Sequence, residues 1–266
     1  MIDSHCHLGS QKFTPEEIPK IIANAREHGI THMITLATAE DDIQTNLQLA
    51  QTYPEISACL GIHPCDVHET RDNFESLLTP YLDDPKVAAI GETGLDYFHP
   101  APEGWTEEDY HARQRDFLRR HFQLAQAHGL NVVIHTRDKF GSASFDDALE
   151  IYREFHKEVR SVFHCFPGPY EQAQQVISLG GLISFTGIVT FKNAQQVAAT
   201  ATSCPPGSYM VETDSPYLSP VPHRGKRCEP AFTKFTGEKI AELRSLSPAE
   251  LSAETDETCC CFFRIS

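Results

Sequence analysis

The sequence predicts an α/β protein, a (β/α)8 barrel of the TIM type, with residues 1–266 forming a single domain. Short apolar runs alternate with longer amphipathic segments along the chain, and eight such runs occur. No low-complexity linker or composition break divides them. A doubly wound open sheet is the alternative fold, but no glycine-rich dinucleotide-binding turn follows the first run.

The eight apolar runs are rich in β-branched residues and are continuous rather than alternating. This pattern is expected of parallel strands that are buried on both faces. The runs are Ile2 to His5, Met33 to Ala37, Ser57 to Ile62, Val87 to Gly91, Val132 to His135, Ser161 to Cys165, Leu182 to Phe185 and Tyr209 to Thr213.

The segments between the runs carry helix signals. Thr14-Pro15-Glu16-Glu17 predicts an N-cap threonine followed by proline at the first helical position, and Gly29 ends that helix. A second amphipathic helix is predicted from Asp109 to His128, ended by Gly129. The capping pattern returns near the C-terminus as Ser247-Pro248-Ala249-Glu250. Alternating strands and helices of this kind favour a parallel barrel.

The composition excludes several classes of protein. Lys and Arg number 22 against 37 Asp and Glu, so the net charge of −15 argues against non-specific coating of long nucleic acids. No apolar run reaches the roughly 18 residues of a membrane span, and Met1 to His7 reads as a strand rather than a signal peptide. The nine cysteines lie mostly in apolar runs, which favours a reducing compartment. We expect a cytoplasmic monomer that does not bind membranes.

Polar residues that a buried strand would not otherwise choose follow most of the predicted strands. In a barrel these C-terminal ends converge on one mouth. His5 and His7 are alternate residues and therefore face the same side. The strand-end residues are His5, His7, His63, Glu92, Asp96, His135, His164, Glu212 and Asp214.

Clustered histidines and carboxylates at one mouth require cations, because partly desolvated carboxylates repel one another. Imidazole suits Zn²⁺ or Mn²⁺, and carboxylates accept these ions and Mg²⁺ as well. Each residue alone has an ordinary alternative: His135 as a core histidine, Glu92 as a helix cap, or Asp214 as part of a turn. Their repetition at six strand ends favours the metal site.

A local basic cluster follows the eighth predicted strand in this acidic protein. Arg224 and Lys226 lie in His223-Arg224-Gly225-Lys226-Arg227, and Arg137 follows the fifth strand. A solvated loop is the alternative, but these cations are placed to meet a phosphate group near the mouth. Cys259-Cys260-Cys261 is interpreted as part of a helix, without a metal.

These motifs together resemble the TatD-like metal-dependent deoxyribonucleases, a branch of the amidohydrolase-like barrels. The likeness covers nearly the whole chain, in order. It rests on Ile2-Asp3-Ser4-His5-Cys6-His7, Gly61-Ile62-His63-Pro64, Gly91-Glu92-Thr93-Gly94-Leu95-Asp96-Tyr97, Ile134-His135-Thr136-Arg137-Asp138, Phe163-His164-Cys165-Phe166, Glu212-Thr213-Asp214-Ser215-Pro216-Tyr217-Leu218 and Pro222-His223-Arg224-Gly225-Lys226-Arg227-Cys228-Glu229-Pro230.

The resemblance implies two divalent metal ions, either Mg²⁺, Mn²⁺ or Zn²⁺. One ion would be held by His5, His7, Glu92 and Asp214, and the other by Glu92, His135 and His164, with Glu92 bridging. Two segments depart from the family pattern. The longer, Pro/Gly-rich loop from Phe98 to Asp109 bears on substrate access, and Thr258 to Arg264 bears on local packing.

The resemblance implies divalent-metal-dependent hydrolysis of phosphodiester bonds, with removal of nucleotides from the 3′ ends of DNA strands, and this is the function that we expect. Asp214 and Glu92 are the expected catalytic residues, with Asp214 accepting the proton of the attacking water. Hydrolysis of a small amide, lactone or phosphoester stays open, as does a non-catalytic metal-binding protein. The residues expected to bind substrate are His63, Tyr97, Arg137, Arg224 and Lys226.

Overall fold

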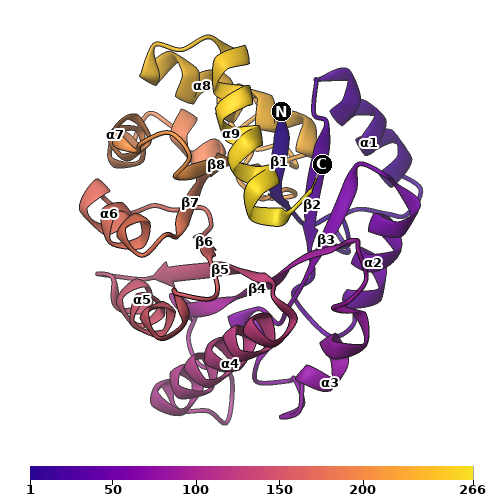
Figure 1. The fold of residues 1–266 in the computed structure, drawn as a ribbon, viewed down its shortest axis with the longest axis vertical. Coiled ribbons are helices and arrows are strands. Elements are labelled where there is room, and N and C mark those ends of the chain that lie inside the picture. The colour runs from indigo at the N-terminus through magenta and orange to yellow at the C-terminus, as the bar shows by residue number, and fades with distance from the viewer. Residues whose placement is uncertain (266) are drawn as a thin grey trace.

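Eight parallel strands form one sheet, in the order β1-β2-β3-β4-β5-β6-β7-β8, in a computed structural model that describes residues 1–265. Figure 1 shows the strands around a common axis with the helices outside them. The strands are β1 (Ile2–Cys6), β2 (His32–Leu36), β3 (Ile56–Leu60), β4 (Val87–Tyr97), β5 (Asn131–Asp138), β6 (Ser161–Phe163), β7 (Leu182–Phe185) and β8 (Tyr209–Val211).

The α-helices follow the strands in alternation, as predicted. They are α1 (Ile18–Glu27), α2 (Ile43–Thr52), α3 (Glu75–Leu78), α4 (Glu107–His128), α5 (Ala143–Phe155), α6 (Tyr170–Ser178), α7 (Gln195–Ser203), α8 (Thr233–Arg244) and α9 (Pro248–Phe263). Short 3-10 helices lie at η1 (Pro64–Asp66), η2 (Thr79–Tyr81), η3 (Gly187–Thr190) and η4 (Pro230–Phe232).

The sheet closes into a nearly complete barrel between β1 and β8. A parallel bridge pairs Cys6 with Ser215, and the His7 N–H donates to the Ser215 carbonyl at 2.7 Å. The Asp214 N–H donates to the His5 carbonyl at 2.9 Å. The fold class predicted from the sequence is therefore confirmed.

The predicted strand β4 was too short. It was expected to end at Gly91 but continues to Tyr97, paired with β5 as far as Asp138. The register shifts between Ile90 and Thr93, so a bulge lies beside Glu92. Glycines and polar residues hid this extension, because a strand that lines a site no longer has a continuous apolar pattern.

The predicted start of α1 was also wrong. The helix begins at Ile18, and Glu17 rather than Thr14 occupies the N-cap position. The Glu17 carboxylate accepts a hydrogen bond from the Thr14 N–H at 2.9 Å and forms an ion pair with Arg227 at 2.8 Å. These contacts hold residues 14–17 in a turn before the helix. The later predictions were confirmed: α4 ends at the left-handed Gly129, and Ser247 forms a capping box with Glu250.

Helix α9 covers the end of the barrel opposite to the mouth (Figure 1). Cys259, Phe262 and Phe263 pack with side chains from inside the barrel, among them Ile34 and Val133. This confirms that Cys259 to Cys261 are helical residues, and it shows how the inner faces of the strands are closed off from solvent at this end. Within residues 1–265, no helix is both long and apolar enough to cross a membrane.

Candidate metal centre

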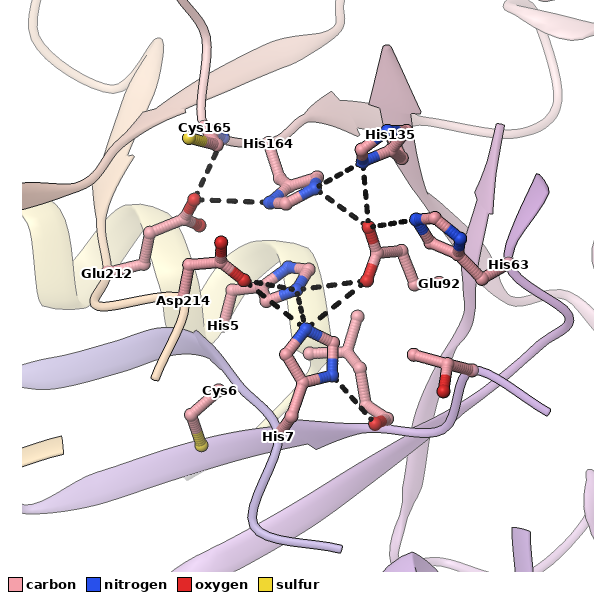
Figure 2. A network of polar contacts seen from close by, with 12 residues as sticks. His5, Cys6, His7, His63, Glu92, His135, His164, Cys165, Glu212 and Asp214 are labelled. Carbon is pink, nitrogen blue, oxygen red and sulfur yellow. Dashed lines mark hydrogen bonds and ion pairs between the residues drawn. The ribbon is translucent and has the colours of Figure 1, made fainter. Parts of the chain in front are cut away.

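Six of the predicted residues come together at the C-terminal ends of five strands. Figure 2 shows their side chains directed toward one another. Four of the donor side chains are almost fully buried, and His135 and Asp214 are each 15 % exposed. The six are His5 from β1, His7 just after β1, Glu92 from β4, His135 from β5, His164 after β6 and Asp214 after β8.

Glu92 lies between two groups of ligand atoms. Its Oε2 atom is 3.4 Å from the Nε2 atoms of both His5 and His7. Its Oε1 atom is 2.9 Å from His164 Nε2 and 3.1 Å from His135 Nδ1. The two oxygens of one carboxylate therefore face different sets of imidazoles, as a bridging ligand does (Figure 2).

Asp214 completes the group around His5 and His7. Its Oδ1 atom lies 3.3 Å from His7 Nε2 and 3.7 Å from His5 Nε2. Asp214 adopts a left-handed backbone conformation with φ 57°, which a non-glycine residue rarely takes outside turns and functional sites. Its N–H bond to the His5 carbonyl holds it in this conformation beside the cluster.

Gly94 allows β4 and β5 to approach each other closely beside His135. A Cβ atom at this position would lie 2.0 Å from the His135 carbonyl oxygen, and the residue has φ 147°. Any larger side chain would push apart the two strands that carry Glu92 and His135. The local backbone is thus shaped around the cluster.

The donor atoms fit divalent cations. They form overlapping groups whose ligand atoms lie within 4.8 Å of one another: His5, Glu92 and His164; His5, His7 and Asp214; and His63, Glu92 and His135. The Nε2 atoms of His5 and His7 are only 3.2 Å apart and point toward the same carboxylate oxygens. Neutral imidazoles and carboxylates together suit Zn²⁺, Mn²⁺ or Fe²⁺, and the carboxylates also suit Mg²⁺.

Protons occupy this cluster when cations do not. Burial lowers the pKa of His7, but its bond to Asp214 and the charge of Glu92 outweigh burial and raise that pKa to about 9. Burial opposes ionisation of Glu92, yet His164, His63 and His135 hold the pKa of its carboxyl well below the usual range. Metal binding must therefore displace a proton from His7.

Two further carboxylates contact the ring nitrogens of His135 and His164 that point away from Glu92. Sequence reasoning did not select these carboxylates as site residues. Asp96 Oδ2 lies 3.1 Å from His135 Nε2, and Glu212 Oε1 lies 3.4 Å from His164 Nδ1. Such contacts fix the tautomer and ring orientation of metal-binding histidines. Both residues stood in the strand-end motifs, but only the register shows that they contact ring nitrogens.

His63 lies beside the cluster. Its Nε2 atom is 3.5 Å from Glu92 Oε1, and its Nδ1 atom accepts the Cys65 N–H at 3.1 Å. Burial lowers the pKa of His63 to about 3, so the ring is neutral near pH 7. The Nδ1 bond leaves Nε2 as the atom that faces Glu92.

Tyr97 does not face the mouth, contrary to its expected role in substrate binding. Its hydroxyl donates to Asp147 on α5 at 2.8 Å and accepts from Arg115 on α4 at 2.9 Å. Its ring stacks on His111 with centroids 3.8 Å apart. As the last residue of the extended β4, it points toward the surrounding helices.

The predicted cations do line a wide cavity of about 1890 Å³ above the cluster. Arg137, Arg224 and Lys226 are exposed there, and the structure adds Lys12, which the sequence analysis missed. Lys12 follows β1 in a loop that carries no motif, so only its position in space identifies it. Among residues 1–265, none of the four forms an ion pair.

Comparisons with known proteins find relatives that match nearly the whole chain. The chain matches the family described as TatD related DNase over residues 2–264. It is 32% identical to the uncharacterized metal-dependent hydrolase YcfH of Escherichia coli strain K12, covering 100% of this chain and 96% of YcfH. It is 30% identical to the uncharacterized metal-dependent hydrolase YabD of Bacillus subtilis, covering 100% of both chains. The crystal structure of the TatD homolog YjjV of Escherichia coli superposes with a TM-score of 0.89 at 25% identity, covering 100% of this chain and 98% of YjjV.

Proposed function

The chain belongs to the family of TatD-related DNases and is a metal-dependent hydrolase, and from this premise we propose that it removes nucleotides from the 3′ ends of DNA strands. The observation that carries the proposal is a set of four cations that line the cavity above the histidine and carboxylate cluster and form no ion pair within residues 1–265. The cavity wall also carries carboxylates such as Asp41 and Asp138, but these four cations give an anionic polymer end several places to bind, whereas a closed apolar pocket would favour a small neutral substrate.

Three of the four cations, Lys12, Arg137 and Arg224, lie over aromatic rings rather than beside carboxylates. Lys12 Nζ lies 4.0 Å from the centre of the Tyr217 ring, and the Arg224 guanidinium lies 3.8 Å from that of Phe191. Arg137 lies 4.1 Å from the Phe98 ring centre. Cations held in this way keep their charge free for phosphate oxygens. The acidic remainder of the chain explains why a strand end, rather than a long duplex, is the proposed substrate.

The proposed ligands divide between two divalent ions. His5, His7, Glu92 and Asp214 would hold one ion, and His135, His164 and Glu92 would hold the other. When bound, such ions polarise a phosphoryl oxygen and lower the pKa of an attacking water toward neutral.

Asp214 is the proposed proton acceptor for that water. Its Oδ1 atom faces His7 and His5, while its Oδ2 atom makes no hydrogen bond or ion pair within residues 1–265. The residue also lines the cavity, which places its carboxylate next to the space that substrate and water would occupy. Burial opposes ionisation, but the bond to His7 and the charges of His7 and His5 lower the pKa of Asp214, so the group is a carboxylate at neutral pH.

The first test is nucleotide release from a short, 3′-labelled single-stranded DNA by chelator-stripped protein, with Mg²⁺, Mn²⁺ or Zn²⁺ restored separately. We expect stepwise release that requires metal and is lost in Glu92→Ala. Glu108→Ala, which changes an exposed carboxylate at the start of α4, is the matched control and should retain full activity.

Two other outcomes decide against the proposal. Absence of release with every metal, despite stoichiometric metal binding, would reassign the site to a small phosphoester, amide or lactone. Absence of hydrolysis of representative esters and amides as well would indicate a metal-binding protein without catalysis.

A further inference from the structure

A second group of metal-ligand side chains lies behind His135, outside the cluster at the barrel mouth. It comprises Cys65 from η1, Asp96 from β4 and His99 from the loop after β4, and their ligand atoms lie within 4.8 Å of one another. Cys65 Sγ is 3.7 Å from His99 Nδ1, which is 3.1 Å from Asp96 Oδ2. The function proposed above uses none of these three as a metal ligand.

Two of the three separations between the ligand atoms agree with a tetrahedral ion. Zinc binds sulfur at about 2.3 Å and nitrogen or oxygen at about 2.0–2.2 Å, so neighbouring sulfur and nitrogen ligands lie about 3.6 Å apart and nitrogen and oxygen ligands about 3.3 Å apart. The observed separations of 3.7 Å and 3.1 Å are close to both values. A thiolate, a carboxylate and a neutral imidazole also balance the two positive charges of the ion.

Asp96 is already oriented for this role. Its Oδ1 atom accepts the N–H groups of Phe98 at 3.0 Å and His99 at 2.9 Å, which fixes the carboxylate while leaving Oδ2 toward His99 and His135. His99 is 49% exposed and lines the cavity, so an ion can reach the group from solvent. Burial and the nearby carboxylates raise the pKa of the Cys65 thiol, so ion binding would release a proton.

We propose that Cys65, Asp96 and His99 form an additional site for a thiophilic divalent ion such as Zn²⁺, with solvent as the remaining ligand. The site shares Asp96 with His135 and so touches the mouth cluster through one carboxylate. An ion bound there withdraws electron density from the Asp96 carboxylate and so weakens its hydrogen bond with His135. This links the free zinc concentration to the affinity of the mouth cluster for its own ions.

The test uses cobalt, because a thiolate bound to Co²⁺ gives a near-ultraviolet charge-transfer band that imidazole and carboxylate ligands do not give. Chelator-stripped protein, kept reduced with a phosphine, is titrated with Co²⁺ while absorbance and bound metal are measured. The proposed ligands at the mouth include no cysteine. We therefore expect the wild type to show the band, and Cys65→Ser to lose it together with one equivalent of bound cobalt.

Cys261→Ser is the matched control, because this exposed cysteine on α9 lies at the other end of the barrel. It should keep both the band and the stoichiometry. His99→Ala, at a half-exposed position, should also lose one equivalent of metal, and circular dichroism verifies that both variants fold. A band that persists in Cys65→Ser, or a wild type with no band, would overturn the proposal. No substrate is present, so this result is independent of the nuclease assay.

Discussion

Asp96 holds His135 in the tautomer that a metal ligand requires, so we expect Asp96→Asn to weaken metal binding at the mouth. Asp96 Oδ2 is 3.1 Å from His135 Nε2, and His135 Nδ1 is 3.1 Å from Glu92 Oε1. An ionised carboxylate only accepts hydrogen bonds. It therefore places the ring proton on Nε2 and leaves the lone pair of Nδ1 directed at the cluster.

Asparagine reverses this arrangement with almost no change in shape. Its Oδ1 atom keeps the N–H groups of Phe98 and His99, which places the amide nitrogen where Asp96 Oδ2 was. The amide then donates to His135 Nε2, and the ring proton moves to Nδ1, toward Glu92. Carboxylates behind metal-binding histidines contribute about 10–100-fold to metal affinity, or roughly 1.4–2.8 kcal/mol, and we expect a loss in this range.

The measurement is competition for Zn²⁺ or Mn²⁺ with a chromophoric chelator. Both proteins carry Cys65→Ser, so that the additional site does not contribute. Thermal unfolding of the metal-free proteins provides the control, because the substitution preserves the number of hydrogen bonds and should change stability little. An Asp96→Asn protein that binds metal as tightly as its parent would refute the tautomer argument.

Three further predictions follow from single contacts. At saturating metal, Asp214→Asn should lower the rate constant of the chemical step by about 10²–10⁴-fold in single-turnover assays, because an amide cannot accept the proton of the attacking water. Arg224→Ala should weaken binding of single-stranded DNA and reduce the slope of log affinity against log salt by about 0.7, whereas Lys157→Ala should change neither. Burial lowers the pKa of His121 to about 4, and its Nε2 atom accepts the Ile62 N–H at 3.1 Å. The unfolded chain binds this proton more tightly than the folded chain. The stability that the neutral ring contributes is therefore full above about pH 6.5 and is lost as pH falls toward 4. In urea unfolding between pH 7 and pH 5, the wild type should lose about 1–2 kcal/mol more free energy of unfolding than His121→Gln.

Each of these predictions has an outcome that contradicts it. Full activity in Asp214→Asn with normal metal content would remove Asp214 from the role of base. An unchanged salt dependence in Arg224→Ala would place the phosphate away from Arg224. Equal losses of stability in the wild type and His121→Gln would show that the buried ring does not control acid unfolding.

The strand-end histidines were predictable because their signal is local. His5 lies in β1 and His7 follows its last residue, two positions along the chain, and the parallel barrel rule then places the ends of other strands beside them. Glu92 could also be selected in this way, although the strand that carries it was predicted too short. Its extension depends on pairing with β5 across a bulge, which no local pattern encodes.

Other residues of the site could not be predicted in this way. Tyr97 was expected at the mouth, but the extended β4 directs its ring toward α4 and α5. Lys12 carries no motif, and only the closed barrel places it at the rim. Cys65 and His99 are 34 residues apart, and their approach depends on the loops that follow β3 and β4.

The sequence by itself determined the barrel class, the order of its elements and the group of chemically suited residues at its mouth. These features follow from short-range periodicity and from rules that hold for every parallel barrel. Tertiary structure alone decided which carboxylate oxygen faces which imidazole nitrogen, because such contacts depend on register and loop paths between segments distant in the chain. Tertiary structure therefore decided two contacts of the site: each oxygen of Glu92 faces a different pair of histidines, and the Asp96 carboxylate contacts His135 Nε2.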